Sequence, residues 1–402
     1  MIAVGKANTE WKAMAAMLQA LSEDIEGLMD ETNKMPDSMS QERREAAERR
    51  IQERRFRPAP FTLGSVIGFI LLLFVVMVAV AYAASRLFQP VRVAYMSSRS
   101  GNYEIYLVDR DGGNPQNLTN HEAQDGVPGW SSTEGAIAFF STRGGDSVAL
   151  YRMDEKGEDV RLLDDTLPYA FGSPQWSPTG EWIAIEVGTE EAIDVYLVSS
   201  ASGEARNLTQ SPDSLDRFGA WSPDGSQLII VSNREGQLCL FLMSIDTGSV
   251  VRLTDPAYGS ATPAWSPDGS SIAFTSEQDG DIDIYIMDAD GGHMKRLTTA
   301  PGFDGFPKWA PDGSQIAFMT VRDENPEIYR INVDGSGLQN LTNNVSFDSA
   351  EGDFSWSPDG KQILFTSDRN GDLDIFVMDA NGTNLLNLSN DLGEDFAPIW
   401  VP

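Results

Sequence analysis

The chain has 402 residues, of which 41% are hydrophobic and 22% charged, a composition typical of a globular protein with room for more than one domain. It carries 29 Lys and Arg against 60 Asp and Glu, a net charge of −31, which argues against nucleic acid as a partner because such binding depends on basic side chains. The single cysteine, Cys239, excludes an intrachain disulfide and a multi-cysteine zinc site, and two histidines leave little for metal chemistry or a catalytic triad. We therefore predict neither a metal site nor a cofactor.

Residues 1–57 are predicted to form a cytoplasmic helical segment. Apolar side chains recur three or four residues apart from Trp11 to Leu28, a spacing that places them on one side of a helix. Met35-Pro36 ends this pattern, and a second, highly charged helix is expected before residue 57. Because a helix of this length is marginal alone, its apolar side either packs within the segment or on the inner membrane leaflet, or mediates self-association or docking of a partner.

Residues 58–88 are predicted to form a transmembrane helix. No charged side chain occurs from residue 58 to residue 85, and residues 61–80 are almost wholly apolar. A helix of about 20 residues crosses the hydrocarbon core of a bilayer, and soluble helices of this length normally carry a polar face. A signal peptide cleaved after Ala83 is the competing interpretation, but the segment ahead of the apolar run is far longer than a signal peptide has.

The charges beside the apolar run predict its orientation. Seven arginines lie between residues 43 and 57, whereas only three follow over a similar distance, at 86, 92 and 99. Positive charge stays on the cytoplasmic side, so the N-terminus is expected in the cytoplasm and the remainder outside the cell membrane. That remainder, residues 91–402, holds 18 Lys and Arg against 49 Asp and Glu and so carries the whole acidic excess.

An internal repeat dominates residues 89–402. Seven tryptophans recur at intervals of 44 to 47 residues, at Trp130, Trp176, Trp221, Trp265, Trp309, Trp356 and Trp400. Most are followed by Ser-Pro-Asp-Gly or a close variant, which suits a type I turn between two strands. Each turn precedes a short apolar strand, an alternating strand and a fourth strand ending in Leu-Thr. Four strands in about 45 residues form the blade of a β-propeller.

The number of repeats predicts seven blades. The strand pair after the turn starts seven times, near Val93, Ile137, Ile183, Leu228, Ile272, Ile316 and Ile363. The first copy has no Trp strand ahead of it, and an extra Trp strand ends the chain at residues 397–400. This last strand is expected to complete the first blade, which closes the ring and removes its exposed edges.

The repeated segments Pro-x-Trp-Ser-Pro-Asp-Gly, Ile-Ala-Phe-Thr-Ser and Asp-Ile-Tyr-x-Met-Asp-Ala-Asp-Gly resemble the WD-like repeat of TolB-type propellers. They cover residues 91–402 and are clearest around Trp265, Trp309 and Trp356. The resemblance implies an all-β, TolB-like propeller at residues 89–402 with a binding role, to which the repeat count assigns seven blades. TolB itself is secreted and carries an α/β domain ahead of six blades, so the resemblance does not extend to membership of the Tol–Pal system.

The sequence favours binding over catalysis. It contains no Gly-x-Ser-x-Gly motif, and His121 and His293 occupy different positions within their repeats, so each is expected to be a loop residue. Carboxylate pairs for glycoside hydrolysis stay open as an alternative, because acids are abundant. Two acidic loops, at residues 279–283 and 368–374, resemble calcium ligands, although Asp-Gly is first a turn signal. The sequons at Asn117, Asn207 and Asn340 share one repeat position and are interpreted as blade structure.

The position five residues before each repeat Trp is the candidate binding site. It holds an acid in five repeats, and Phe171 and Ser260 in the other two. The resemblance to related propellers implies that the Trp strand lines the central channel, so these acids would ring one mouth and attract cations. Alternatively, each Asp caps the turn that enters its own strand. The candidate ligand-binding residues are Asp125, Asp216, Asp304, Glu351 and Asp395.

We therefore predict a single-pass cell-membrane protein whose acidic propeller lies outside the membrane and binds a protein, a peptide of basic character or another cationic ligand. The expected role is that of a non-catalytic envelope scaffold or sensor, with no nucleic acid involved. The alternative is a carbohydrate-active or hydrolytic β-propeller enzyme. The sequence names neither the partner nor the oligomeric state, and it leaves open whether the N-terminal helix transmits a signal.

Overall fold

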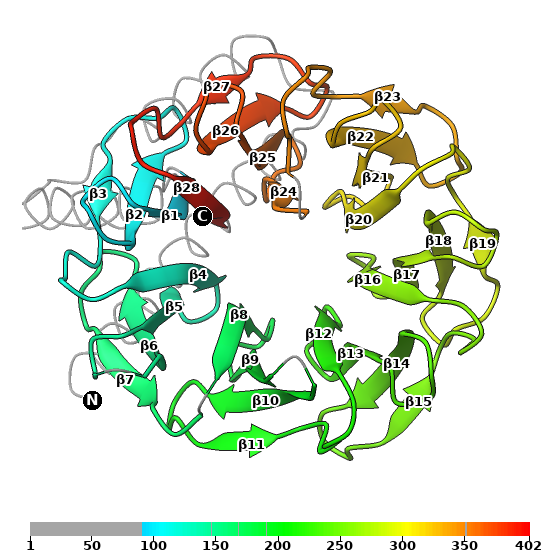
Figure 1. Ribbon diagram of the computed structural model, residues 1–402, viewed down its shortest axis with the longest axis horizontal. Helices are drawn as coiled ribbons and strands as arrows, with labels where there is room; N and C mark the ends of the chain where they lie inside the picture. The colour runs from blue at the N-terminus through cyan, green and yellow to red at the C-terminus, as the bar shows by residue number, and fades with distance from the viewer. Residues whose placement is uncertain (1–90, 146, 168, 190, 350–351) are drawn as a thin grey trace, which may run out of the picture. The chain divides into compact units, whose positions relative to one another are not determined.

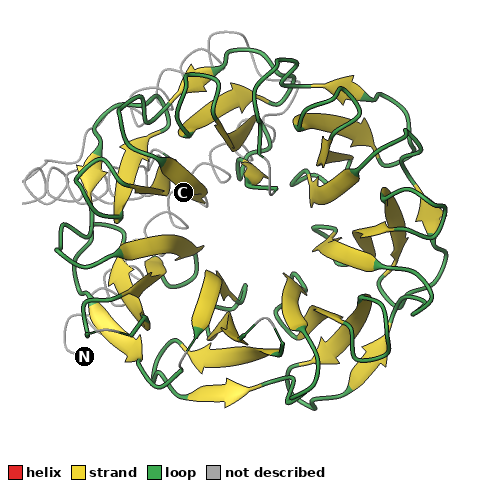
Figure 2. Ribbon diagram, viewed as in Figure 1, coloured by secondary structure: helices red, strands yellow, loops and turns green. Residues whose placement is uncertain are grey.

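The computed structural model describes residues 91–402 except 146, 168, 190 and 350–351. This part of the chain forms 28 β-strands in seven four-stranded sheets arranged around a ring (Figure 1). It contains no helix (Figure 2), and hence none that could cross a membrane. The helical segment predicted at 1–57 and the transmembrane helix predicted at 58–88 lie outside the described residues and stay predictions.

Each sheet is one blade, and its strands follow one another from the centre of the ring outwards (Figure 1). The innermost strands are β4 (Asp125–Ser131), β8 (Ala170–Trp176), β12 (Asp216–Trp221), β16 (Ser260–Trp265), β20 (Asp304–Trp309), β24 (Phe354–Trp356) and β28 (Asp395–Val401). The second strands are β1 (Arg92–Ser97), β5 (Ala136–Ser141), β9 (Trp182–Gly188), β13 (Gln227–Ser232), β17 (Ser271–Ser276), β21 (Gln315–Thr320) and β25 (Gln362–Ser367).

The third strands are β2 (Glu104–Asp109), β6 (Ala149–Asp154), β10 (Ile193–Ser199), β14 (Cys239–Ser244), β18 (Asp283–Asp288), β22 (Glu327–Asn332) and β26 (Asp374–Asp379). The outermost strands are β3 (Gln116–Asn117), β7 (Arg161–Asp164), β11 (Ala205–Asn207), β15 (Val250–Arg252), β19 (Lys295–Arg296), β23 (Gln339–Asn340) and β27 (Leu386–Asn387). We number the blades in chain order from the one that contains β1.

The two faces of the ring differ because all strands within a blade are antiparallel. The face where the innermost strands begin carries the loops between second and third strands and the loops from one blade to the next; we call it the loop face. The opposite face carries the Ser-Pro-Asp-Gly turns and the turns into the outermost strands; we call it the turn face. The propeller begins and ends at the turn face, where Arg92 pairs with Val401.

The ring closes in the predicted way. β28, the last strand of the chain, pairs with β1, so that Trp400 lies opposite Val93 and blade 1 is built from both ends of the propeller. The prediction of seven blades and of closure by residues 397–400 is therefore confirmed. Closure leaves no inner edge of blade 1 unpaired.

The hydrophobic core lies between neighbouring blades rather than within one sheet. Successive side chains of a strand point to opposite faces of its sheet, so each blade contributes to two clusters. In β1, for example, Val93 and Tyr95 pack against Leu364 and Ile375 of blade 7, whereas Ala94 packs towards blade 2. One such cluster occupies each of the seven contacts between adjacent blades.

The repeat tryptophans tie adjacent blades together. The indole Nε1 donates to the carbonyl oxygen of the residue that precedes the Trp of the previous blade, at 3.0–3.4 Å. The tryptophans that make this bond are Trp176, Trp221, Trp309, Trp356 and Trp400. Within the described part of the chain, the buried Nε1 atoms of Trp130 and Trp265 have no hydrogen-bond partner.

The Ser-Pro-Asp-Gly turn stabilises itself and contacts its neighbour. In blade 4 the Ser222 hydroxyl donates to Asp224 at 2.7 Å and accepts the N–H of Gln227 at 2.9 Å. Gly225 has a φ of +73°, and a Cβ there would lie 3.0 Å from the Thr179 side chain of blade 3. Glycine is therefore required both for the left-handed backbone and for the close approach.

A β-bulge interrupts the innermost strands where they line the channel. The register of β4, β16, β20 and β28 against the second strands shifts at this point, and the residue three before the Trp has a φ near +50°. These residues are Val127, Thr262, Phe306 and Ala397. The bulge turns backbone N–H groups towards the preceding blade, where Val127 donates to the Met96 sulfur and Ala397 to Asp353.

Candidate functional site

The described carboxylates of the predicted ring begin their innermost strands at the loop face. Asp125, Asp216, Asp304 and Asp395 are the first residues of β4, β12, β20 and β28, and each is at most 1% exposed. Glu351 lies outside the described residues. These four side chains are therefore enclosed within their blades.

An arginine neutralises each of these carboxylates. The N–O distances are 2.6 Å for Asp125–Arg143, 2.7 Å for Asp216–Arg234 and 2.8 Å for Asp304–Arg322. Each arginine follows the second strand of the same blade and also donates from Nε to the last hydroxyl of that strand, at 3.0 Å. The four carboxylates thus form no exposed ring of negative charge, and the ligand-binding role predicted for them gains no support from this geometry.

The pair in blade 1 is looser than the others. Arg99 lies 3.4 Å from Asp395 because it also pairs with Asp391 and donates to the Tyr95 hydroxyl at 2.7 Å. As in Asp125, one carboxylate oxygen of Asp395 is buried without a hydrogen-bond partner in the described structure. Burial raises the pKa of Asp395 to about 6, and the shared guanidinium opposes this shift only in part.

Blade 7 uses a carboxylate that the spacing did not predict. Asp348 is fully buried and pairs with Arg369 at 2.6 Å, in the way that Asp216 pairs with Arg234. It lies eight residues before Trp356 rather than five, because the loop into β24 is longer. The arginine after the second strand was the pattern in the sequence that could have located it.

The two blades without the acid also lack the arginine. Phe171 and Ser260 occupy the acid's position in blades 3 and 5, and the residues 18 positions further on are Thr189 and Gln278. In blade 5 the Ser260 hydroxyl instead donates to that of Ser276, at 3.4 Å. Aspartate and arginine are therefore present together or absent together, as expected for a structural ion pair.

The sequons have a structural role. The side-chain oxygen of Asn207 accepts the backbone N–H groups of Thr209 and Gln210, and the Thr209 hydroxyl donates to Asp194 at 2.6 Å. These contacts connect the outermost strand to the start of the third strand. The asparagine turn recurs at two further sequons, Asn117 and Asn340. The interpretation of the sequons as blade structure is confirmed.

Protein donors also engage the acidic loops that resemble calcium ligands. Arg296 pairs with both Asp279 and Asp283, and Asp374 accepts a hydrogen bond from Asn387 at 2.7 Å. Among the residues that the structure describes, no three His, Cys, Asp or Glu side chains are placed to hold one metal ion.

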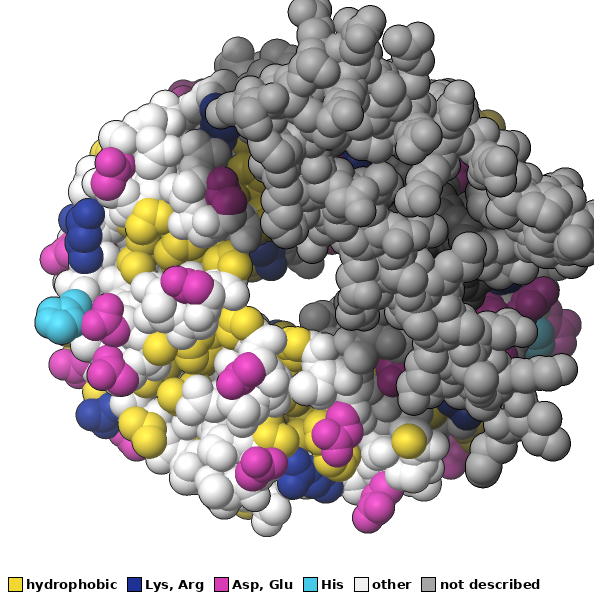
Figure 3. All heavy atoms as spheres, turned by 180° about the vertical axis from the view of Figure 1, so that it is seen from behind, with side chains coloured by type: hydrophobic (Ala, Val, Ile, Leu, Met, Phe, Trp, Pro, Cys, Tyr) yellow, Lys and Arg dark blue, Asp and Glu magenta, His cyan; other side chains and the backbone are white. Residues whose placement is uncertain are grey.

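A cavity of about 1040 Å³ occupies the channel between the innermost strands of blades 1, 2, 3, 6 and 7. Its wall runs from Phe347, Leu373 and Phe396 at the loop face to the level of the repeat tryptophans. Most of the lining side chains are apolar, and the bulges contribute backbone groups. Figure 3 shows the opposite end of the channel, at the turn face, where hydrophobic side chains among the described residues gather around the central opening and acidic ones are scattered further out.

Lys308 and Asp353 are the charged side chains among the described residues that line this cavity. Lys308 directly precedes Trp309 in β20 and is exposed to the cavity. Desolvation by the surrounding innermost strands lowers the pKa of Lys308, and the attraction of Asp353 compensates only in part. The cavity thus contains an ammonium group whose charge is incompletely compensated.

Apolar side chains lie at the loop-face end of the cavity, where Phe347 and the half-buried Phe396 line its wall. Phe347 is 54% exposed, Leu392 fully exposed, and the Tyr103 ring packs edge-on against Phe396 at 5.5 Å. These residues belong to loops of blades 1 and 7, apart from Phe396, which belongs to β28. We call Phe347 and Phe396, together with Tyr103, the apolar rim.

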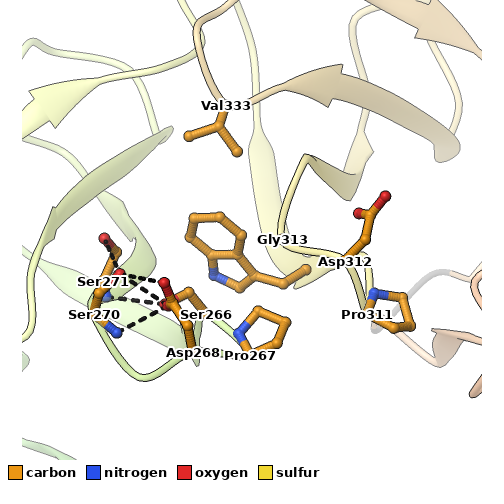
Figure 4. A pocket seen from close by; sticks show the side chains of 10 residues that line it. Ser266, Pro267, Asp268, Ser270, Ser271, Pro311, Asp312, Gly313 and Val333 are labelled. Carbon is orange, nitrogen blue, oxygen red and sulfur yellow. Dashed lines mark hydrogen bonds between the residues drawn. The ribbon is translucent and has the colours of Figure 1, made fainter.

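The crevices between blades on the turn face differ from this cavity. One of about 470 Å³ lies between the turns of blades 5 and 6, lined by Pro267 and Pro311 (Figure 4). Its polar groups bond to one another, since Asp268 accepts hydrogen bonds from Ser266 and Ser270. The Ser266 hydroxyl lowers the pKa of Asp268 to about 2. Because these groups are already paired, the crevice offers few free partners to a ligand.

Fold and cavity define a closed, seven-bladed β-propeller with a partly apolar central cavity. A family model described as the TolB beta propeller domain matches residues 161–259 and 254–350. A TolB homologue of Chlorobium luteolum is 30% identical over 39% of this chain and 35% of its own length. Residues 161–350 therefore belong to the TolB beta propeller family, and the whole ring has the TolB-like propeller fold.

Other relatives include enzymes. The uncharacterized peptidase YuxL of Bacillus subtilis is 30% identical over 35% of this chain and 28% of its own length. This chain thus spans about a third of the length of the curated relatives it matches. An oligogalacturonate lyase of Vibrio parahaemolyticus shares the fold with a TM-score of 0.56 at 18% identity, covering 71% of this chain and 85% of the lyase. A puromycin-hydrolyzing peptidase of Mycobacterium tuberculosis also shares the fold, with a TM-score of 0.56 at 15% identity. The match covers 72% of this chain and 50% of the peptidase.

Proposed function

We propose that this chain is a non-catalytic binding protein of the cell envelope, whose propeller binds a peptide segment of a protein partner in the central cavity at the loop face. The observation that carries the proposal is the cavity of about 1040 Å³ with the apolar rim at its open end. Concave, mostly apolar sites with a few polar groups are typical of ligand binding. Membership of residues 161–350 in the TolB beta propeller family agrees with a protein partner.

The apolar rim supports a peptide rather than a small polar ligand. Exposed aromatic side chains are costly in water and are enriched at protein interfaces, where their burial contributes most of the affinity. Phe347 and Phe396 both line the cavity, so one ligand can contact both.

The proposal is tested by affinity capture with the full-length chain from its own cells. A double variant, Phe347→Ser with Phe396→Ser, removes the rim, and Val160→Ser with Val251→Ser removes two exposed apolar residues near the outer edge as a matched control. We expect one partner to be captured by the wild type and the control and lost by the rim variant. Equal capture by all three proteins, or no capture, contradicts the proposal.

We further propose that residues 58–88 anchor the protein in the cell membrane with residues 1–57 in the cytoplasm. The uncharged run and the arginine asymmetry support this topology. Protease added to intact spheroplasts should then degrade the propeller and spare residues 1–57. A shortened propeller found free in the periplasm would instead establish cleavage after Ala83.

Catalysis is the competing class, favoured by the relatives that are peptidases or lyases. Within the cavity the acid–base pair open to such a role is Lys308 with Asp353. The described histidines lie elsewhere, His121 on a blade 1 loop and His293 on a turn with its side chain 90% exposed. We expect the full-length chain to turn over neither peptide substrates nor oligogalacturonate. Turnover that is abolished by Asp353→Asn would replace the binding proposal.

A further inference from the structure

Hydrogen-bond donors without partners line the central cavity. Within the described structure, Trp130 Nε1 and Ser349 Oγ are buried polar atoms that have no hydrogen-bond partner, and both residues contribute to the cavity wall. Five other repeat tryptophans donate to the preceding blade, whereas Trp130 and Trp265 do not, and of these two only Trp130 lines the cavity among the described residues. Unpaired buried polar groups are rare in native proteins, and here they fit a ligand that brings acceptors.

Lys308 adds a positive charge to these donors. It is exposed to the cavity, and desolvation by the neighbouring strands outweighs the attraction of Asp353. A cation in a mostly apolar cavity gains from a second anion beside Asp353, because charge attraction is stronger where the surroundings are less polar than water. The cavity therefore favours an anionic group, although the surface of the propeller is strongly acidic.

The apolar rim and Lys308 lie at different depths. The strand that carries Lys308 starts at the loop face with Asp304, and four residues of an extended strand span about 13 Å. Phe347 and Phe396 mark the loop-face end of the same cavity. A ligand that reaches both is therefore extended and about four residues long, if it is a peptide, since an extended chain also spans about 3.3 Å per residue.

Building on the proposed function, we infer that the cavity binds an extended peptide through a carboxylate, which pairs with Lys308 while apolar side chains of the peptide contact Phe347 and Phe396. The carboxylate is either that of the peptide C-terminus or that of an Asp or Glu side chain. A carboxylate accepts several hydrogen bonds, which matches the donors of the wall. This ligand is the reverse of the basic segment that the acid ring predicted.

Two synthetic libraries of seven-residue peptides, attached through their N-termini, test the inference with the full-length protein. One library ends in a free carboxylate and the other in an amide. Enrichment of the free-carboxylate library, with apolar residues among the last four, is expected if the C-terminus binds. Recurrent Asp or Glu in the amide library would identify a side-chain carboxylate as the source. Equal enrichment without acidic preference, or no enrichment, overturns the inference.

Variants of the protein then test whether Lys308 binds the carboxylate of the selected peptide. Lys308→Met is expected to weaken its affinity at least 10-fold, whereas Lys308→Arg keeps most of it. Lys361→Met is the matched control, because Lys361 is 78% exposed in a turn-face loop and its loss changes the net charge equally. Unchanged affinity in Lys308→Met, or an equal loss in Lys361→Met, overturns the inference. Thermal unfolding of each variant confirms the fold, and Lys308→Gln replaces Lys308→Met if the latter unfolds.

The inference and the proposed function can fail separately. If the rim variant loses its captured partner but no carboxylate preference appears, the binding proposal stands and the inference fails. If oligogalacturonate binds in a manner that depends on Lys308 and no peptide does, the anionic site is real but the peptide ligand is wrong. Peptide binding that survives in the rim variant would contradict the proposed location.

Discussion

At the scale of single residues, the propeller repeats one buried ion pair. In blades 1, 2, 4 and 6 a carboxylate at the start of the innermost strand meets an arginine that follows the second strand, and in blade 7 a carboxylate in the loop before that strand does the same. The pair fastens the loop between second and third strands to the innermost strand of the same blade. Blades 3 and 5 lack both partners, so a blade can form without the pair. Because the two residues are present or absent together, we expect that one of them without the other is unfavourable.

Substituting one member of an ion pair should lower the free energy of unfolding more than substituting both members. Asp216→Ser leaves Arg234, which is 22% exposed, without its carboxylate, and we expect the free energy of unfolding to fall by about 2 kcal/mol. The double variant Asp216→Ser with Arg234→Gln copies the residues of blade 5 and should recover about half of that loss. Urea unfolding of the full-length chain measures both. If the double variant loses as much free energy of unfolding as Asp216→Ser and Arg234→Gln lose separately when added together, the two residues do not act as a pair.

The pH dependence of stability should single out Asp395. Burial raises its pKa in the folded protein to about 6, against about 3.9 in an unfolded chain. The folded protein thus binds the proton more tightly than the unfolded chain does. The contribution of Asp395 to the free energy of unfolding therefore falls as the pH rises from about 4 to about 6, by at most about 3 kcal/mol.

Asp395→Asn does not titrate and separates this effect from that of other acids, such as Asp268 and Asp359, whose pKa values are lowered. The unfolding free energy of the Asn variant minus that of the wild type should rise across this window and stay level above about pH 7. Urea titrations at successive pH values test this expectation. A difference that is constant from pH 4 to pH 7 would show that Asp395 keeps an ordinary pKa.

At the scale of elements, the innermost strand has two tasks. Its Trp reaches back to the preceding blade, and its bulge turns the backbone at the channel wall. Both depend on spacing within one short strand, which explains why Trp, Ser-Pro-Asp-Gly and the second strand follow one another so regularly. The strand that binds the neighbouring blade is also the strand that lines the cavity.

The hydrogen bond of the repeat Trp can be isolated because two tryptophans differ in one contact. Trp309 Nε1 donates to the carbonyl oxygen of Ala264 at 3.0 Å, whereas the buried Nε1 of Trp265 has no partner in the described structure. Trp309→Phe should therefore destabilise the protein by about 1 kcal/mol more than Trp265→Phe, since both lose similar apolar area. Thermal and urea unfolding of the two variants give the difference. Equal losses, or the opposite order, would assign the Trp effect to packing alone.

At the scale of the whole molecule, closure makes the seven blades interdependent. Each hydrophobic cluster is shared by two blades, and the cluster between blades 7 and 1 includes Trp400 of the last strand. Removing β28 exposes the edge of β1 and opens this cluster to water.

Truncation after Leu392 should thus abolish cooperative unfolding or cause aggregation, far beyond the effect of losing an ordinary tail. Removal of Pro402 alone is the control, because this residue is exposed and lies outside β28. Calorimetry and gel filtration of the full-length chain and both truncated chains provide the measurement. If truncation after Leu392 leaves the melting curve unchanged, closure contributes little to stability.

The sequence by itself determined the blade, its number and the closing strand. These features follow from local chemistry repeated along the chain: the turn in Ser-Pro-Asp-Gly, the alternation of apolar residues and the surplus Trp strand before Pro402. The same local reading placed the sequons in the blade, because the Asn turn and the Thr hydrogen bond lie within a few residues of one strand.

Only the tertiary structure decided which charges are free. The acids five residues before each Trp looked like a cation site. Strand pairing within the blade, however, brings each described one to an arginine that lies 18 residues further along the chain, or 296 residues away for Asp395 and Arg99. Lys308 carried no distinguishing pattern, because its environment consists of innermost strands from other blades that only the closed ring brings together. A sequence shows how many charged side chains a protein has. Whether another charge neutralises each of them depends on distance and desolvation, which are set only when the ring forms.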